Sequence, residues 1–260
     1  MALHRGGARV TRRFFVDPGT LPGAGTAVVI EGPLAHRLAK VLRLRPGNDV
    51  ALFDGSGEDV IVRLDEVGDR RVTAAVLERV SGPREAPTKI HLFQSITKGE
   101  RFEWLVEKAT ELGVARIVPL LAARAVVKTA GEGNRLDRWR RIAVEAAEQC
   151  GRSVVPVVEP PVSFADALTS APGIILLPYE AADHLTPNIQ AVLQERIDEL
   201  YAEGAVSILV GPEGGYETAE VEQAQSAGAR IVTLGERVLR SETAGLIAAT
   251  LVMHACGELG

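Results

Sequence analysis

The first third of the chain carries short apolar runs with the spacing of strands. Up to about residue 85, turn-forming pairs such as Asp54-Gly55 and Gly68-Asp69 separate these runs. One helical segment, Pro33 to Leu42, interrupts them and places its leucines and Val41 on one face. The strand-like runs are RRFFV, TAVVI, DVALF, DVIVRL and RVTAAVL. The pattern predicts a small β-barrel or half-open β-domain of about 70 residues.

A break in the pattern follows at residues 81–87, where the sequence reads SGPREAP. Two prolines and a glycine in this stretch exclude a continued strand or helix, and favour a linker. A chain of 260 residues has room for two modest domains. We therefore expect one domain over residues 1–85 and a second over 86–260.

The rest of the chain alternates strand-like and helix-like segments. A first helix places Phe102, Leu105 and Val106 on one stripe and ends at Gly113, and a second helix runs from Leu136 to Cys150. Alternation of this kind predicts an α/β domain, with a parallel sheet and helices on both of its faces. The expected strands lie near 89–96, 116–121, 154–158, 173–178, 205–210 and 230–234.

Composition narrows the class of protein. Hydrophobic residues are 46% and charged residues 24%, which is ordinary for a globular chain. The two cysteines, Cys150 and Cys256, form no disulfide framework, and the five histidines show no metal-ligand spacing, so we expect no metal and a cytoplasmic protein. The longest apolar stretch, Ala244 to Cys256, is too short to span a membrane, and the basic N-terminus lacks the apolar segment of a secretory signal.

Charge is distributed unevenly along the chain. The net charge of −5 speaks against nucleic acid as a partner, yet residues 1–45 hold eight Lys or Arg against only Asp17 and Glu31. This segment suits a surface that faces phosphates, although a solvated basic surface explains the pattern equally well. Its basic residues are Arg5, Arg9, Arg12, Arg13, Arg37, Lys40, Arg43 and Arg45.

Two loops near the C-terminus are candidates for chemistry, because ligands of open α/β sheets bind beyond the carboxyl ends of the strands. The first is Gly211-Pro212-Glu213-Gly214-Gly215, whose glycines let the backbone approach a ligand closely. A tight strand-to-helix turn explains the same residues equally well. The loop lacks the Lys-Ser/Thr of a phosphate-binding Walker motif, and no G-x-G-x-x-G fingerprint follows any strand.

The second loop runs from Glu236 to Ala244 and concentrates Arg237, Arg240 and Glu242 at a helix start. Structure alone accounts for two of its residues, since Ser241 suits an N-cap and Glu242 suits the first turn. It does not account for Arg240, which makes that arginine a candidate for function.

Motifs along nearly the whole chain resemble the RsmE family, SPOUT-class methyltransferases that methylate N3 of a uridine in 16S ribosomal RNA. The motifs occur in the family's order, which makes the resemblance far more specific than any single motif. They are Arg13-Phe14-Phe15-Val16, His36-x-x-x-Lys40-Val41-Leu42-Arg43-Leu44-Arg45-Pro46-Gly47, Lys108-Ala109-Thr110-Glu111-Leu112-Gly113-Val114, Arg138-Trp139 with Glu145, Glu148, Gln149 and Arg152, Gly211 to Gly215, and Leu234 to Ala244.

The resemblance implies a PUA-like β-barrel for RNA and a SPOUT α/β domain with a trefoil knot that binds S-adenosylmethionine. It also implies a homodimer and, as partner, the 16S rRNA of the 30S subunit. The implied cofactor-binding residues are Leu177, Pro178, Gly211, Pro212, Glu213, Gly214, Gly215, Leu234, Gly235, Val238, Leu239, Thr243 and Ala244, with Tyr179 and Glu180 beside them.

Methylation at N3 requires removal of a proton and stabilisation of the anion that remains. From their positions, we expect Arg240 to stabilise that anion or hold a phosphate, and Glu213 or Glu242 to accept the proton. The residues expected to contact RNA are Arg9, Arg12, Arg13, His36, Arg43 and Arg45.

Two other functions remain open at this point. A SPOUT 2′-O-ribose methyltransferase would share the cofactor site and attack with a hydroxyl group. A non-catalytic ribosome-assembly protein would keep the RNA-binding domain alone, although the intact glycine loop and the segment Arg240 to Thr243 count against it.

Overall fold

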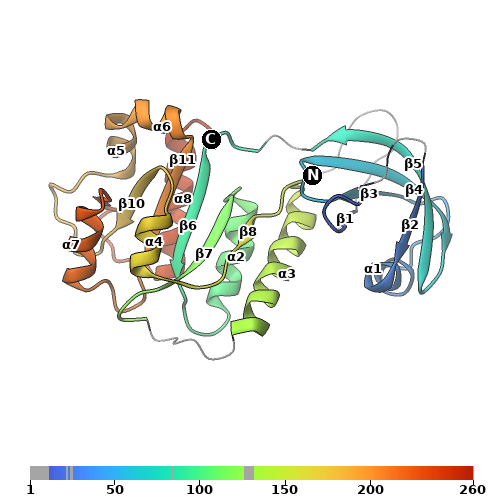
Figure 1. Ribbon diagram of the computed structural model, residues 1–260, viewed down its shortest axis with the longest axis horizontal. Coiled ribbons are helices and arrows are strands. Elements are labelled where there is room, and N and C mark those ends of the chain that lie inside the picture. The colour runs from blue at the N-terminus through green and yellow to red at the C-terminus, as the bar shows by residue number, and fades with distance from the viewer. Residues whose placement is uncertain (1–11, 22, 24–25, 83–84, 126–131, 260) are drawn as a thin grey trace. The chain divides into compact units, whose positions relative to one another are not determined.

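The computed structural model describes residues 12–21, 23, 26–82, 85–125 and 132–259. These residues divide between two compact units (Figure 1). The first unit lies within residues 1–85 and 147–155, and the second within 86–146 and 156–260. Nothing in the sequence pattern indicated that residues 147–155, the end of a long helix and the loop after it, belong to the first unit.

The first unit is built on a five-stranded sheet. Its strands, in spatial order, are β1 (Arg13–Phe15), β3 (Asp49–Phe53), β4 (Glu58–Val67), β5 (Arg71–Ser81) and β2 (Ala27–Glu31). β1 runs parallel to β3 and the other neighbours are antiparallel. In β2, Val28 and Ile30 are buried while the residues between them are exposed, as the period of a strand requires. The sheet curls into a half-barrel, which confirms the predicted β-domain (Figure 1).

The helical segment of this unit differs from the expected single α-helix. It comprises α1 (Gly32–His36) and a π-helix, η1 (Arg37–Val41). The N–H of Leu42 donates to the carbonyl of Arg37, five residues back, at 2.9 Å. Both parts still bury apolar side chains, those of Ala35 and Leu38, against the half-barrel core.

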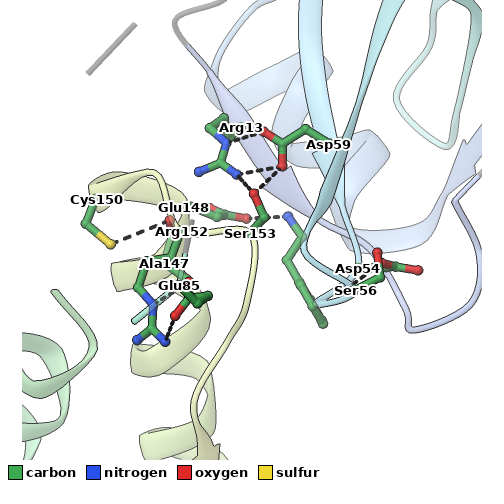
Figure 2. Close-up of polar contacts among 11 residues, drawn as sticks. Arg13, Asp54, Ser56, Asp59, Glu85, Ala147, Glu148, Cys150, Arg152 and Ser153 are labelled. Atoms are coloured by element: carbon green, nitrogen blue, oxygen red, sulfur yellow. Dashed lines mark hydrogen bonds and ion pairs between the residues drawn. The ribbon is translucent and has the colours of Figure 1, made fainter. Parts of the chain in front are cut away.

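Arg13 was expected to contact RNA, but its guanidinium is buried against Asp59 (Figure 2). Nε and Nη2 of Arg13 donate to the two carboxylate oxygens of Asp59 at 3.0 and 2.7 Å. Nη2 also donates to Ser153 Oγ, which in turn donates to Asp59. The two charged side chains are 6% and 0% exposed. The guanidinium of Arg13 is therefore bound inside the first unit and is not presented to RNA.

Further polar contacts bind residues 147–155 to the half-barrel. Glu148 accepts a hydrogen bond from the backbone N–H of Phe15 at 3.0 Å and pairs with Arg37 at 2.8 Å. Arg152 pairs with Glu85 at 2.7 Å (Figure 2). The first unit is thus completed by a segment that lies far from it in the sequence.

The second unit contains the predicted parallel sheet with helices on both faces. Its strands, in spatial order, are β12 (Arg230–Val232), β10 (Ile174–Pro178), β11 (Ala205–Val210), β6 (Lys89–Ser95), β7 (Arg116–Leu121) and β8 (Val157–Val158), and β9 (Val162–Ser163) pairs with β7. All of these pairs are parallel, which confirms the α/β class. Two expected strands are shorter than predicted: 154–158 shrinks to β8, and 230–234 ends at Val232.

Helices cover this sheet on both sides. α8 packs on β6 and β11 with α2 and α5 against it, while α4 and α7 contribute to the core on the other face. The helix expected from Leu136 begins earlier, at Glu132. The helices are α2 (Arg101–Glu111), α3 (Glu132–Cys150), α4 (Phe164–Ser170), α5 (Ile189–Glu195), α6 (Ile197–Glu203), α7 (Thr218–Ser226) and α8 (Ser241–Ala255).

Parallel strands place their carboxyl ends along one edge of the sheet, where the loops after β6, β10, β11 and β12 gather. The trefoil knot stays a prediction.

Among the described residues, no helix combines the length and the apolar character needed to cross a bilayer.

Candidate active site

A cavity of about 660 Å³ lies in the second unit at the carboxyl ends of β10, β11 and β12. Its walls come from three loops, one after each strand, together with Arg101 at the start of α2 and Ala244 in α8. The loops contribute Pro178 to Glu180, Val210 to Gly215, and Leu234 to Ser241. These are the loops at which the sequence predicted a ligand site.

The glycine loop, residues 211–215, has a shape that side chains would disturb. Gly215 has a φ of +69°, and a Cβ there would overlap the carboxylate of Glu180. A Cβ on Gly211 would stand 3.0 Å from the ring of Tyr216. The backbone therefore approaches its neighbours as closely as a glycine allows.

Three side chains from other elements hold this loop. Arg101 Nη1 donates to the carboxylate of Glu213, Arg124 Nη1 donates to the carbonyl of Gly214 at 3.2 Å, and Ser241 Oγ donates to the carbonyl of Gly211 at 2.5 Å. The sequence suggested Ser241 as the N-cap of α8. That position is taken by Arg240, which makes no side-chain cap, and Ser241 instead fixes the start of the glycine loop.

Arg101 joins two carboxylates that the sequence singled out. Besides its bond to Glu213, its Nε lies 3.8 Å from Oε1 of Glu242. Glu242 is 8% exposed and does not line the cavity, and its Oε2 is buried without a hydrogen-bond partner among the described residues. Glu213 is exposed and lines the cavity. The two carboxylates thus have different access to a ligand.

Arg237 and Arg240 contrast with Arg101. Both are exposed at the cavity, and neither forms an ion pair with any of the residues that the structure describes. Guanidinium groups in this position can bind an anionic ligand, and the role expected for Arg240 stays a prediction.

Tyr216 lies directly behind the glycine loop, and its hydroxyl is buried with no hydrogen-bond partner among the described residues. Burial, and then the nearby carboxylates of Glu220 and Glu180, raise the pKa of this hydroxyl well above its usual value. The phenol stays neutral at physiological pH, which excludes Tyr216 as a proton acceptor.

Most of the predicted cofactor residues lie on the cavity wall. Leu177 does not, because its side chain is buried in the core of the sheet, and Thr243 is also absent from the wall. Sequence reasoning missed Arg101 and Arg124. A cation at the first position of a helix, where the dipole disfavours it, was the available signal for Arg101. The predicted residues on the wall are Pro178, Gly211, Pro212, Glu213, Gly214, Gly215, Leu234, Gly235, Val238, Leu239 and Ala244.

The residues expected to contact RNA lie in the first unit. Arg43 and Arg45 are exposed, and Arg43 has a φ of 51°, rare for a residue with a side chain. Arg12 is exposed and donates to the carbonyl of Leu42 at 3.3 Å. His36 Nδ1 lies 2.6 Å from a carboxylate oxygen of Asp69. Arg9 lies outside the described residues.

No group of three or more His, Cys, Asp or Glu side chains that could hold a metal ion occurs in the part of the chain that the structure describes.

Comparison with known proteins identifies the family. Residues 84–253 match the RNA methyltransferase domain family. The chain is 32% identical to ribosomal RNA small subunit methyltransferase E of Bacillus subtilis, with 86% of this chain and 89% of the relative covered. It is 34% identical to the protein of the same name from Mycobacterium bovis, with 92% and 90% covered.

A solved structure agrees with these relatives. Ribosomal RNA small subunit methyltransferase E of Neisseria gonorrhoeae, bound to S-adenosylmethionine, is 34% identical and superposes with a TM-score of 0.80 over 94% of this chain and 97% of that one. These matches confirm the resemblance found in the motifs, and this chain belongs to the ribosomal RNA small subunit methyltransferase E family, the RsmE family of RNA methyltransferases.

Proposed function

We propose that this protein transfers a methyl group from S-adenosylmethionine to N3 of a uridine in the 16S rRNA of the small ribosomal subunit, in the cytoplasm. Membership of the RsmE family gives the substrate class. The single observation that carries the proposal within this chain is the cavity beyond β10, β11 and β12, because it combines a glycine-backbone wall with exposed arginines and a carboxylate.

The residues of the cavity fit S-adenosylmethionine. A volume of about 660 Å³ lies in the range of sites for small molecules. Leu234, Val238 and Leu239 offer apolar surface for an adenine ring, and the glycine loop offers backbone groups. Glu180 and Glu213 carry charge opposite to that of a sulfonium. When bound, this cofactor supplies a methyl group on positively charged sulfur.

The chain's own part in the reaction concerns the proton on N3. Glu213 is the acceptor we propose, since its carboxylate lines the cavity and Glu242 is enclosed. The proton would pass to a carboxylate oxygen of Glu213, and the electron pair left on N3 would form the bond to the methyl carbon. The methyl–sulfur bond would break at the same time, and its electron pair would stay on the sulfur of a neutral thioether. Arg240 stabilises the negative charge that develops on the uracil.

The first unit is the proposed RNA-binding domain. Arg12, Arg43 and Arg45 present exposed guanidinium groups, to which we add His36 and Arg9 from the sequence. The target base must leave its stack to reach a cavity of this kind. Phosphate contacts from the first unit would hold the RNA while the base enters the second.

We also propose that the protein acts as a homodimer. Ile247 and Leu251 lie one turn apart on α8 and both are exposed, and Trp104 is exposed on α2, which packs against α8. The occupant we propose for this apolar surface is a second copy of the chain. Light scattering tests the dimer, and Leu251→Glu is expected to give a monomer.

A methylation assay with nucleotide mapping tests the proposed function. Small subunits that lack the modification are incubated with the protein and the cofactor, and mass spectrometry locates the new methyl group. Methyl on a uridine base at N3 supports the proposal. Methyl on a ribose would instead support the 2′-O alternative, and absence of cofactor binding in calorimetry would support a non-catalytic assembly protein.

The role of Arg240 is tested in the same assay. Loss of one group that stabilises a developing anion costs about 10²–10³-fold in rate, so Arg240→Ala should lower the rate by this factor with an unchanged Kd for the cofactor. Arg240→Lys should recover part of the rate. Methylation by Arg240→Ala at the wild-type rate would contradict the assignment.

A further inference from the structure

Arg101 stands where its positive charge is locally unfavourable. It occupies the first position of α2, and the positive end of a helix dipole disfavours a cation there. The helix supplies no compensating N-cap, because Glu100 makes no side-chain cap bond. The contacts of the Arg101 side chain therefore have to explain its position.

Those contacts are two carboxylates on different elements. Glu213 belongs to the glycine loop and lines the cavity, and Glu242 belongs to the first turn of α8 behind it. Among the described residues, neither carboxylate pairs with any other Lys, Arg or His side chain. One guanidinium thus sets the orientation of both.

The burial of Glu242 indicates that Glu242 holds Arg101 in place and that Arg101 in turn orients Glu213. Its carboxylate is nearly enclosed, and the second oxygen has no partner among the described residues, so it can move little and cannot reach a substrate in the cavity. A fixed carboxylate holds the guanidinium from behind. The guanidinium in turn holds the carboxylate of Glu213, which lines the cavity.

From this geometry we infer that Arg101 is a positioning residue for methyl transfer, which acts by holding the Glu213 carboxylate toward the substrate. The inference rests on the proposed function, in which Glu213 accepts the N3 proton. A displacement of about 1 Å in a reacting group can cost 10²-fold in rate, so loss of Arg101 is expected to lower kcat by about this factor.

Cofactor affinity should respond differently. The backbone of the glycine loop has two other anchors, Arg124 at Gly214 and Ser241 at Gly211. Removal of Arg101 frees the Glu213 side chain while the loop stays in place. The Kd for S-adenosylmethionine, measured by calorimetry without RNA, should therefore change less than about threefold, which is well under 1.4 kcal/mol.

The test is a double-mutant cycle with Arg101→Ala, Glu213→Gln and the two combined, measured as kcat and KM on small subunits. If Arg101 acts through Glu213, the double variant is no slower than the slower single variant. Arg101→Lys keeps the charge but loses the planar fork that reaches two carboxylates, so it should recover only part of the rate.

Arg138→Ala is the matched control, because the exposed guanidinium of Arg138 in α3 pairs with Glu103 of α2, and neither residue lines the cavity. It should keep the wild-type kcat. Additive losses in the cycle would show that Arg101 acts independently of Glu213 and overturn the inference. So would an unchanged kcat in Arg101→Ala, or a cofactor Kd raised more than tenfold at unchanged kcat.

Failure of the proposed function would look different. In that case the wild-type protein itself would place no methyl group on N3 of a uridine. Failure of the inference alone would leave wild-type methylation intact. Arg101→Ala would then either behave like Arg138→Ala or lose activity additively with Glu213→Gln.

Discussion

Arg13 and Asp59 form a bidentate ion pair inside the first unit, with the guanidinium also 4.8 Å from the centre of the Phe53 ring. The pair connects strands β1 and β4, which lie on either side of β3. Ser153 closes the network from the segment 147–155. The contact therefore ties three distant parts of the sequence together.

Asp59→Ala should destabilise the first unit strongly, because it leaves the Arg13 guanidinium buried without its partner. Breaking a buried pair in this way costs about 3–5 kcal/mol. All tryptophan and tyrosine residues lie in the second unit, so their fluorescence does not report on unfolding of the first unit. Hydrogen exchange of the amides of β3 to β5 measures it directly.

Asp49→Ala is the control for this prediction. Asp49 forms a bidentate pair with Arg63 between neighbouring strands, but that guanidinium is exposed, and water solvates it when the partner is lost. The double variant Arg13→Met/Asp59→Leu should regain most of the lost protection, since apolar side chains can replace a buried pair. Equal losses in Asp49→Ala and Asp59→Ala would refute the argument.

The burial of Arg13 also shows where sequence reasoning stops. The run Arg12-Arg13-Phe14-Phe15 predicts a strand that carries basic side chains. Because successive side chains of a strand point to opposite faces, the run predicts that Arg12 and Arg13 face opposite sides of the sheet. It cannot show that a carboxylate 46 residues away and a hydroxyl 140 residues away meet Arg13. Only the sheet order brings them together.

Local patterns succeeded where the chemistry is local. Strand and helix periods predicted the parallel sheet, and the position of loops at the carboxyl ends of strands predicted a ligand site at residues 211–215 and 236–244, most of which line the cavity. Arg101 was missed because its partners come from two other elements. The π-helix η1 was missed because α- and π-helices share nearly the same apolar spacing over so few residues.

Gly215→Ala should weaken cofactor binding. A residue other than glycine at a φ of +69° is strained by about 1–3 kcal/mol, and the new methyl group would displace the Glu180 carboxylate from its place at the cavity. We expect a Kd for S-adenosylmethionine at least about tenfold higher, equivalent to about 1.4 kcal/mol, in calorimetry.

Gly228→Ala provides the comparison. Gly228 has a φ of +87° at the end of α7, and its missing Cβ faces open space away from the cavity. This variant carries the same kind of backbone strain, so its thermal stability should fall while its affinity for the cofactor stays at the wild-type level. A Kd raised equally in both variants would mean that strain, and not the Glu180 contact, controls binding.

Replacement of Arg43 and Arg45 by alanine should reduce the salt dependence of RNA binding. The association constant for RNA falls as salt rises, and each phosphate contact adds about 0.7 (single strand) to 0.9 (duplex) to the steepness of log K against log salt. Loss of two contacts should therefore make the slope of the double variant shallower by about 1.4–1.8. Fluorescence anisotropy with a labelled fragment of 16S rRNA at several salt concentrations measures the slope.

Arg63 and Arg79 serve as controls for this measurement. Both are exposed arginines of the same unit, but each is already paired with a carboxylate, that of Asp49 or Glu58. Their replacement should leave the slope close to the wild-type value. An unchanged slope in the Arg43/Arg45 variant would remove these two residues from the RNA interface.

His91 should make the second unit less stable in mild acid. Burial, and then the positive charge of Arg116, lower the pKa of this imidazole below its usual value of 6.5. Below pH 6.5 the unfolded chain binds a proton that the folded chain does not yet accept, so the stability present above this pH is lost as the pH falls toward the lowered pKa.

Both tryptophans, Trp104 and Trp139, lie in the second unit, and their fluorescence follows its unfolding in urea. His91→Leu removes the titrating group with little change in volume, so its urea midpoint should fall less than that of the wild type between pH 7.5 and about 5.5. If the two midpoints fall in parallel over this interval, His91 takes up its proton equally well in both states, and the acid sensitivity comes from other groups.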